Sequence, residues 1–246
     1  MNNQAQILNE NYLHDCDLII IGASGGIGQY LIKTYKSTNK IFGTYCHHTS
    51  ADLIEGPKYY HVDLCDTASI NEFIDHISDQ VTKPVVIYTS GVSPNSPVYK
   101  VKDDDLSQTM AINLTGAILI TRGMLPVMKN LKFGRFIYLS SILSRMAVYG
   151  TAIYSVTKAG LNTFAKVVAL ENAKFGITAN SIALGYFDVG IIAAVPPDYL
   201  NNHVIPSIPE GRLGSPIDIV NAIEFIVKTS YLTGSIIDLN GGVIAF

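Results

Sequence analysis

A tyrosine and a lysine stand four residues apart in the segment AIYSVTKAG, residues 152–160. Residues four apart on a helix are neighbours on one face, so the phenol of Tyr154 and the ammonium group of Lys158 would lie side by side. A free phenol has a pKa near ~10, and a nearby positive charge lowers that value toward the range where proton transfer is efficient. An amphipathic helix with a solvated lysine has the same spacing. The pair alone is compatible with either interpretation.

A second candidate site is the glycine-rich segment GASGGIG, residues 22–28, which directly follows the apolar run DLIII. Glycine tolerates positive φ and lets a ligand approach the backbone closely. The start of a following helix would present free N–H groups and a positive dipole end to a pyrophosphate. The alternative is a turn that merely closes a helix onto a strand. The spacing is not G-x-G-x-x-G and the P-loop Lys-Ser/Thr is missing, but the position between strand and helix favours dinucleotide binding.

The elements that would position these groups alternate along the chain. The spacing of apolar residues predicts helices over 26–36, 67–77, 106–129, 152–174 and 216–229. Short apolar runs predict strands at 16–21, 40–45, 58–62, 83–90, 135–140, 178–183 and 235–239. A loop with mixed Pro and Gly lies between the last two strands. This alternation predicts a mostly parallel sheet covered by helices on both faces. We expect one domain over 1–246, with a short N-terminal extension (1–15) and a substrate loop (184–212).

Composition narrows the function classes. Charged residues make up 15% of the 246 residues and the net charge is −3, so no basic stripe is available for nucleic acid. The start of the chain has no basic region followed by an apolar core, the run DLIIIG is too short to span a bilayer, and no other stretch is expected to reach the required length. The three cysteines form no paired framework, so a cytoplasmic protein without a membrane partner is expected.

Three segments in register, GASGGIG, YSVTK and LTGSIIDLNGG, resemble the short-chain dehydrogenase/reductase family, and the likeness extends over about Asp17 to Gly242. The family motif T-G-x-x-x-G-x-G falls on Gly22, Gly26 and Gly28, with Ile21 in place of the threonine. Its Y-x-x-x-K motif falls on Tyr154 and Lys158. The resemblance implies a doubly wound Rossmann-type domain with about seven parallel strands and an NAD(P)-dependent oxidoreductase.

The resemblance also implies a catalytic set of Asn113, Ser141, Tyr154 and Lys158. Tyr154 would be the acid/base, and Lys158 would lower its pKa together with the oxidised nicotinamide and would bind the nicotinamide ribose. Ser141 would bond the substrate oxygen, and Asn113 would hold a water linked to Lys158. Each residue also has a structural alternative, such as a cap for Ser141 or a helix bend for Asn113. The implied cofactor contacts are Gly22, Ser24, Gly26, Ile27, Gly28, Tyr45, Asp63, Leu64, Gly91, Tyr154, Lys158 and Gly185.

The sequence departs from the family pattern in three places. The N-N-A-G segment after the fourth strand is Tyr88-Thr89-Ser90-Gly91, so only the glycine remains. The usual P-G pair after the sixth strand is Leu184-Gly185. A threonine that often contacts the cofactor carboxamide is Val189, so an altered cofactor pose is one expectation.

NADP(H) is the expected coenzyme, with NAD(H) possible. In this family an acidic residue at the end of the second strand usually bonds the ribose of NAD, and here that residue is Tyr45. His47, His48 and Thr44 are expected near a 2′-phosphate, and Asp63 near the adenine edge. Against this preference, the basic residue that NADP-users often carry inside the glycine loop is Gly25.

The substrate is expected to be a ketone or secondary alcohol with a largely apolar or neutral group, because 185–214 is rich in Ile, Val, Ala and Tyr. The segment IPEGRLGSPIDIVNAIEFI resembles 3-oxoacyl-[acyl-carrier-protein] reductases, which suggests a 3-oxoacyl thioester. A basic patch for an acidic carrier protein would come from Arg122, Lys129, Lys132, Arg135 and Arg145. A sugar or secondary-metabolite reductase and a cofactor-binding protein without turnover remain alternatives, whereas an epimerase or dehydratase would need a longer C-terminal region.

Two further expectations concern assembly and metals. The helices around 106–129 and 152–174 carry apolar residues on more than one face. Members of the family that the chain resembles pair these helices, and the last strand, across two-fold axes. A homotetramer is therefore expected, with a dimer as the alternative. The cluster of Cys46, His47 and His48 with His61 and Cys65 has poor ligand spacing, so no metal is expected.

Overall fold

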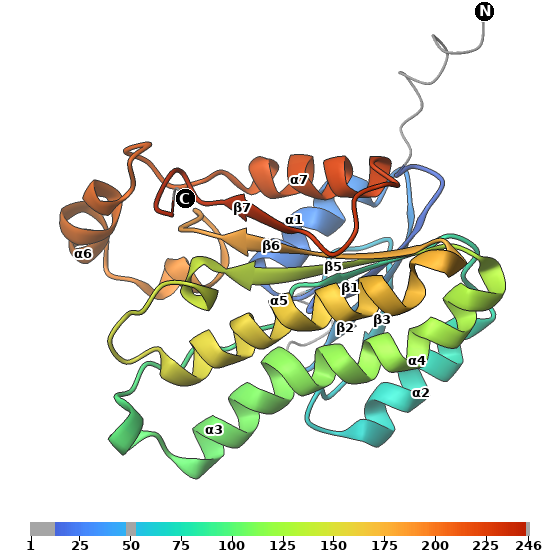
Figure 1. Cartoon of the computed structure of the whole chain (residues 1–246), viewed down its shortest axis with the longest axis horizontal. Helices are drawn as coiled ribbons and strands as arrows, with labels where there is room; N and C mark the ends of the chain where they lie inside the picture. Colours follow the sequence, from blue (N-terminus) through green and yellow to red (C-terminus); the bar gives the residue numbers. More distant parts are fainter. Residues whose placement is uncertain (1–12, 48–52, 245–246) are drawn as a thin grey trace, which may run out of the picture.

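The computed structural model describes residues 13–47 and 53–244 as one α/β unit (Figure 1). Seven strands lie within two residues of the predicted positions: β1 Asp17–Ile21, β2 Lys40–Tyr45, β3 Lys58–His61, β4 Pro84–Tyr88, β5 Gly134–Ser141, β6 Ile177–Leu184 and β7 Ile236–Leu239. All pair in parallel in the order β3-β2-β1-β4-β5-β6-β7. The predicted doubly wound parallel sheet is therefore confirmed.

Helices cover both faces of this sheet (Figure 1). On one face pack α2 (Thr67–Ser78), α4 (Gly116–Leu131) and α5 (Ala152–Asn172), and on the other α1 (Gly26–Tyr35) and α7 (Pro216–Lys228). Successive strand residues point to opposite faces, so Ile19 and Ile21 of β1 enter the first core while Leu18 and Ile20 enter the second. Because helices cover both faces of a parallel sheet, each face of this sheet packs into a hydrophobic core of its own.

Local signals fix where several helices begin. Asp66 accepts a hydrogen bond from Ala68 N at the start of α2. At α7 the N-cap Ser215 and Asp218 form a capping box, and Pro216 occupies the first helical position. These helices start where caps are readable in the sequence, so their predicted and observed N-termini coincide.

The predicted helix 106–129 belongs to a longer run, Asp103–Leu131, made of α3 (Asp103–Met110), a π-helical turn η4 (Ala111–Thr115) and α4. By length and composition this run could cross a membrane, with a hydropathy of 1.4, so the expectation that no stretch reaches that length was wrong. Its apolar residues Ala117, Ile120, Met124 and Met128 are fully buried against the sheet. That burial is the arrangement of a core helix.

The segment expected to be a substrate loop is more ordered than its Pro and Gly content predicts. It contains short helical turns at Gly190–Ala194, Pro197–Tyr199 (α6), Leu200–Val204 and Ile205–Ser207. In Figure 1 this segment lies beyond the carboxyl ends of β5, β6 and β7, on the left of the view. It therefore stands where a loop over the strand ends would enclose a ligand.

Candidate active site and cofactor pocket

A cavity of about 770 Å³ lies at the carboxyl ends of the strands. Its walls come from the glycine loop after β1, the segments after β2, β3, β4 and β5, the start of α5, and the loop after β6. The glycine loop stands at the switch point of the sheet, where β1 lies between β2 and β4. All predicted site residues except Asn113 line this cavity.

The glycine loop is held by close backbone contacts that exclude side chains. Gly22 has φ +91°, and a Cβ there would lie 2.5 Å from Ser90 Oγ. A Cβ on Gly28 would lie 2.3 Å from Gly22 O, and one on Gly26 would lie 2.9 Å from Gly190 N. Because α1 begins at Gly26, the free N–H groups of its first turn belong to the cavity wall. This is the geometry expected of a pyrophosphate site.

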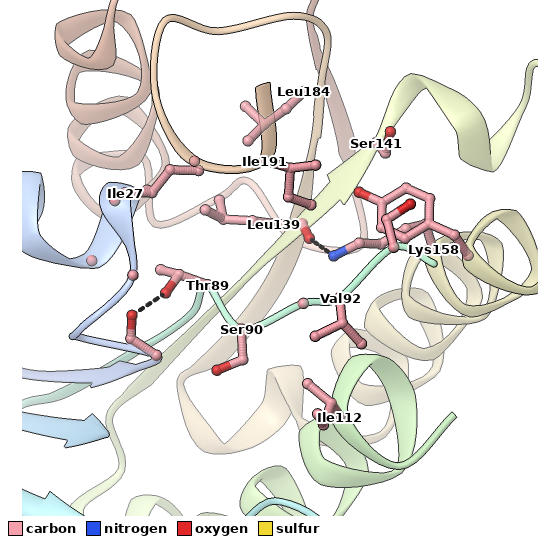
Figure 2. Close-up of a pocket in the computed structure, with 18 of the residues that line it drawn as sticks. Ile27, Thr89, Ser90, Val92, Ile112, Leu139, Ser141, Lys158, Leu184 and Ile191 are labelled. Carbon is pink, nitrogen blue, oxygen red and sulfur yellow. Dashed lines mark hydrogen bonds between the residues drawn. The ribbon is translucent and has the colours of Figure 1, made fainter. Parts of the chain in front are cut away.

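Thr89 and Ser90 anchor this loop, a role that the sequence did not reveal. The Thr89 hydroxyl donates to the carbonyl oxygens of Ile21 (2.8 Å) and Gly22 (3.1 Å), and the backbone N–H groups of Thr89 and Ser90 both donate to Ile21 O. Figure 2 shows one of the Thr89 hydrogen bonds. At Thr89 the departure from N-N-A-G therefore places a hydroxyl where the family has an amide, and this hydroxyl connects the end of β4 to the glycine loop.

The side of the cavity that was expected to hold the adenine is formed by the segments after β2 and β3. Tyr45 packs edge-on against Tyr59 and His61, with ring centroids 6.5 and 5.6 Å apart. Asp63 lines the cavity, and its Oδ1 accepts a hydrogen bond from Cys65 N at 2.8 Å. The Thr44 hydroxyl, expected near a 2′-phosphate, is buried and accepts a hydrogen bond from Gly22 N.

The histidines near the end of β2 differ in whether they line the cavity. His47 lines the cavity, whereas His61 on β3 does not. His48 lies outside the described residues. Across 13–47 and 53–244, no group of three or more His, Cys, Asp or Glu side chains is placed to hold a metal.

Asn113 is completely buried behind the cavity, on the π-helical turn η4. Its Oδ1 accepts a hydrogen bond from Val92 N (2.8 Å), and its Nδ2 donates to Val92 O (2.9 Å) and to Thr157 Oγ1 (3.2 Å). The amide thus ties the segment after β4 to the helix. π-Helical turns occur frequently at functional sites.

Lys158 is buried, and its Nζ donates to the carbonyl oxygen of Leu139 at 2.7 Å (Figure 2). The same Nζ lies 5.5 Å from the centroid of the Tyr154 ring. Burial lowers the pKa of Lys158 to about 8. A Cβ on Gly91 would lie 3.4 Å from this Nζ and 3.6 Å from Asn113 Oδ1, so the glycine leaves Lys158 and Asn113 close to each other.

Burial dominates the electrostatics of Tyr154. Burial raises the pKa of this phenol, a hydrogen bond with Ser141 opposes the rise, and Lys158 makes no resolved contribution. Desolvation disfavours the phenolate. The expected lowering of this pKa by Lys158 together with an oxidised nicotinamide stays a prediction.

Ser141 ends β5 and faces the cavity (Figure 2), and its hydroxyl is hydrogen-bonded to Tyr154. Its Oγ also accepts a hydrogen bond from Leu143 N at 3.2 Å, which is the capping role named as its structural alternative. Two hydroxyls in contact, one of them backed by a buried lysine, can bind a carbonyl oxygen and deliver a proton to it.

The cavity wall also contains residues that the sequence did not single out. Polar side chains come from Ser93 and Asn95 after β4, Gln108 on α3, and Thr151 before α5, and apolar ones from Val148, Ile191 and Val195. They lie on four segments far apart in the chain, and no motif spacing connects them. These residues line the same cavity as Ser141 and Tyr154.

The predicted basic patch is not assembled as expected. Arg135 is buried at the start of β5 and donates to the carbonyl oxygens of Gly134 and Gly176. Arg145, beyond the other end of β5, forms an ion pair with Asp238. Because these arginines lie at opposite ends of one strand, they belong to different surfaces.

Comparisons with known proteins agree with this geometry. A family model described as enoyl-(acyl carrier protein) reductase matches residues 29–244. The chain is 31% identical to an acetoacetyl-CoA reductase of Shinella zoogloeoides over 232 residues, covering 91% of this chain and 96% of that one. It is 28% identical to the 3-oxoacyl-[acyl-carrier-protein] reductase FabG of Escherichia coli (strain K12), covering 91% and 95%. A crystal structure assigned to a gluconate dehydrogenase of Agrobacterium tumefaciens has a TM-score of 0.85 at 22% identity, covering 94% and 96%, which supports the fold.

Proposed function

Because the chain belongs to the short-chain dehydrogenase/reductase family and is an NAD(P)-dependent oxidoreductase that reduces ketones, we propose that it reduces a 3-oxoacyl thioester with NADP(H), using Tyr154 as proton donor. The observation that carries this proposal is the contact of Ser141 and Tyr154 inside the cavity, with Lys158 buried behind them. The three cysteines are free in the structure, which supports a cytoplasmic enzyme.

Each member of the catalytic set has a separate task in this proposal. The reduced nicotinamide supplies a hydride when it is bound. Ser141 donates a hydrogen bond to the substrate oxygen and stabilises the charge that develops there, and Tyr154 delivers the proton. Lys158 holds charge beside the phenol and contacts the nicotinamide ribose, and Asn113 fixes the backbone at Val92 through two hydrogen bonds.

The glycines of the loop 22–28 and the positive dipole end of α1 would hold the pyrophosphate of the cofactor. Tyr45 in place of a carboxylate leaves no negative charge to repel a 2′-phosphate at the end of β2, and His47 lines the same side of the cavity. These two residues support NADP(H) over NAD(H). Asp63 stays on the adenine side with its carboxylate directed to Cys65 N.

We expect NADPH to bind more tightly than NADH, and His47→Ala to reduce that ratio about three- to tenfold because a phosphate contact of about 1 kcal/mol is lost. Dissociation constants from coenzyme fluorescence would measure both. His61→Ala is the matched control, since that imidazole also touches Tyr45 but does not line the cavity. Tighter binding of NADH by the unaltered protein would contradict the NADP(H) proposal.

The apolar character of the wall around Ser141 supports a neutral acyl group. Val148, Ile191 and Val195 line the cavity beside a few hydroxyl and amide groups. Among the described residues that line it, Lys158 is the one lysine or arginine. Steady-state assays with acetoacetyl thioesters and NADPH test the proposal, and turnover that is saturable in thioester is expected. If a cyclic ketone or a sugar is turned over and no thioester is, the acyl assignment is wrong and the carbonyl reductase assignment remains.

We also propose that the enzyme is a homotetramer. The outer face of α5 carries exposed apolar side chains, with Leu170 85%, Val156 58% and Val167 45% exposed, and on α4 Ile118 and Leu131 are partly exposed. Between these helices lies a groove lined by residues such as Ile118, Leu125 and Phe164. A monomer mass from light scattering at micromolar concentration would contradict this assembly.

A further inference from the structure

Tyr88, the last residue of β4, is fully buried, and its hydroxyl donates a hydrogen bond to the carbonyl oxygen of Ile112. Ile112 precedes Asn113 on the π-helical turn η4. On the premise of the proposed function, in which Asn113 belongs to the catalytic set, we propose that Tyr88 is a positioning residue that fixes this turn and, through it, the Asn113 amide.

The geometry of the turn explains why an outside donor is needed. In an α-helix the N–H of Gly116 would donate to the carbonyl oxygen of Ile112, four residues earlier. Here Gly116 N donates to Ala111 O, five residues earlier. The usual donor is therefore used elsewhere, and the phenol of Tyr88 bonds the oxygen that the π-turn leaves over. An unpaired buried carbonyl would be costly.

Space for the phenol is provided by Gly116. A Cβ at this position would lie 2.7 Å from the Tyr88 hydroxyl, so any larger residue would press on it. Burial raises the pKa of Tyr88, which keeps the phenol protonated and able to donate. The strand residue and the helix glycine thus fit each other, although they lie 28 positions apart in the sequence.

The link from this hydrogen bond to the reacting groups is short. Tyr88 holds the backbone at Ile112, and the adjacent Asn113 holds both backbone groups of Val92. Figure 2 shows Val92 and Ile112 on the same side of the pocket, Val92 after β4 and Ile112 on the helix. Gly91 precedes Val92, and a Cβ on Gly91 would lie 3.4 Å from Lys158 Nζ. A displaced turn would therefore move the surroundings of Lys158.

The test is Tyr88→Phe, with Tyr138→Phe as the matched control. Tyr138 is also a buried strand tyrosine whose hydroxyl bonds the same long helix, at Thr121 Oγ1 (2.8 Å), but it lies away from the cavity. We expect Tyr88→Phe to lower kcat about ten- to hundredfold, because small misplacements of catalytic groups have effects of this size. KM for coenzyme should stay within about twofold, and the pH profile of kcat should shift in the same direction as in Asn113→Ala.

Tyr138→Phe should lower thermal stability to a similar extent but leave kcat and its pH profile unchanged. Equal loss of kcat in both tyrosine variants, or unchanged kcat in Tyr88→Phe, would overturn the positioning role. Asn113→Ala separates this failure from failure of the proposed function. If Asn113→Ala keeps full turnover, the catalytic set is wrong, whereas if it loses turnover and Tyr88→Phe does not, only the role of Tyr88 is wrong.

Gly116→Ala gives a second approach if Tyr88→Phe does not fold. The added methyl group presses on the Tyr88 hydroxyl from the helix side, so kcat should fall, and combining it with Tyr88→Phe should recover part of the stability lost in Gly116→Ala. Full activity of Gly116→Ala, or a double variant without any recovery, would contradict the proposed contact.

Discussion

Tyr154→Phe is expected to lower turnover at least ~100-fold, because general acid catalysis by a positioned side chain contributes about 10²–10⁴-fold. The phenol is buried beside Ser141, and phenylalanine keeps its shape but removes the proton that the carbonyl oxygen must receive. Coenzyme binding and the circular dichroism spectrum should be unchanged. Single-turnover kinetics with NADPH would separate the loss of the chemical step from any change in binding.

Tyr149→Phe is the control for this variant. That tyrosine stands five residues earlier, is 83% exposed, and does not line the cavity, so its hydroxyl should be dispensable. If Tyr154→Phe retains a tenth or more of the wild-type rate, Tyr154 is not the proton donor.

Lys158→Met is expected to abolish most turnover and at the same time to stabilise the fold. Burial lowers the pKa of this lysine from 10.5 to about 8, so a charged Lys158 costs about 3 kcal/mol of folding free energy at pH 7. Loss of its hydrogen bond to Leu139 O offsets about 1 kcal/mol of the gain. The net effect is a rise of about 4–8 °C in Tm for a chain of this size.

The sign of the pH dependence follows from the lowered pKa. Below about pH 8 the lysine is protonated in both folded and unfolded states, and its cost is complete. Between about pH 8 and 10.5 the unfolded chain binds more protons, so the wild-type free energy of unfolding rises with pH. The advantage of Lys158→Met should therefore shrink over this window. Lys166→Met, on the exposed side of the same helix, should show neither effect, and a Tm difference independent of pH would refute the buried charge.

The strands and long helices could be predicted because their signals are local. The four uninterrupted apolar residues of DLIII indicate a strand buried on both faces, and capping residues such as Asp66 and Ser215 mark helix starts. The cavity-lining residues Gly22, Tyr154 and Lys158 could be predicted because each belongs to a motif whose residue spacing can be read directly from the sequence. The short helices in 190–207 were missed because their Pro and Gly content is that of a loop.

Other features depend on contacts across the fold. The π-helical turn at Asn113 bonds Tyr88 on β4 through Ile112 O, and no pattern within AINLTG predicts this contact. The basic patch was wrong because a list of charges does not say that Arg135 and Arg145 stand at opposite ends of a strand. The rise that burial causes in the pKa of Tyr154 could not be read from the sequence, since burial is a property of the packed structure.

The position of β1 between β2 and β4 has a consequence during synthesis. β1 pairs with β2 soon after it leaves the ribosome, but its other edge is completed only by β4, residues Pro84–Tyr88. At about 5–20 residues per second, the 67 residues between Ile21 and Tyr88 take about 3–13 s to add. During that time one edge of β1, whose residues 18–21 are apolar, has no partner, which makes the nascent N-terminal half prone to pairing with other chains. The strand order that places the glycine loop at the switch point of the sheet therefore also leaves β1 with one unpaired edge until β4 has been made.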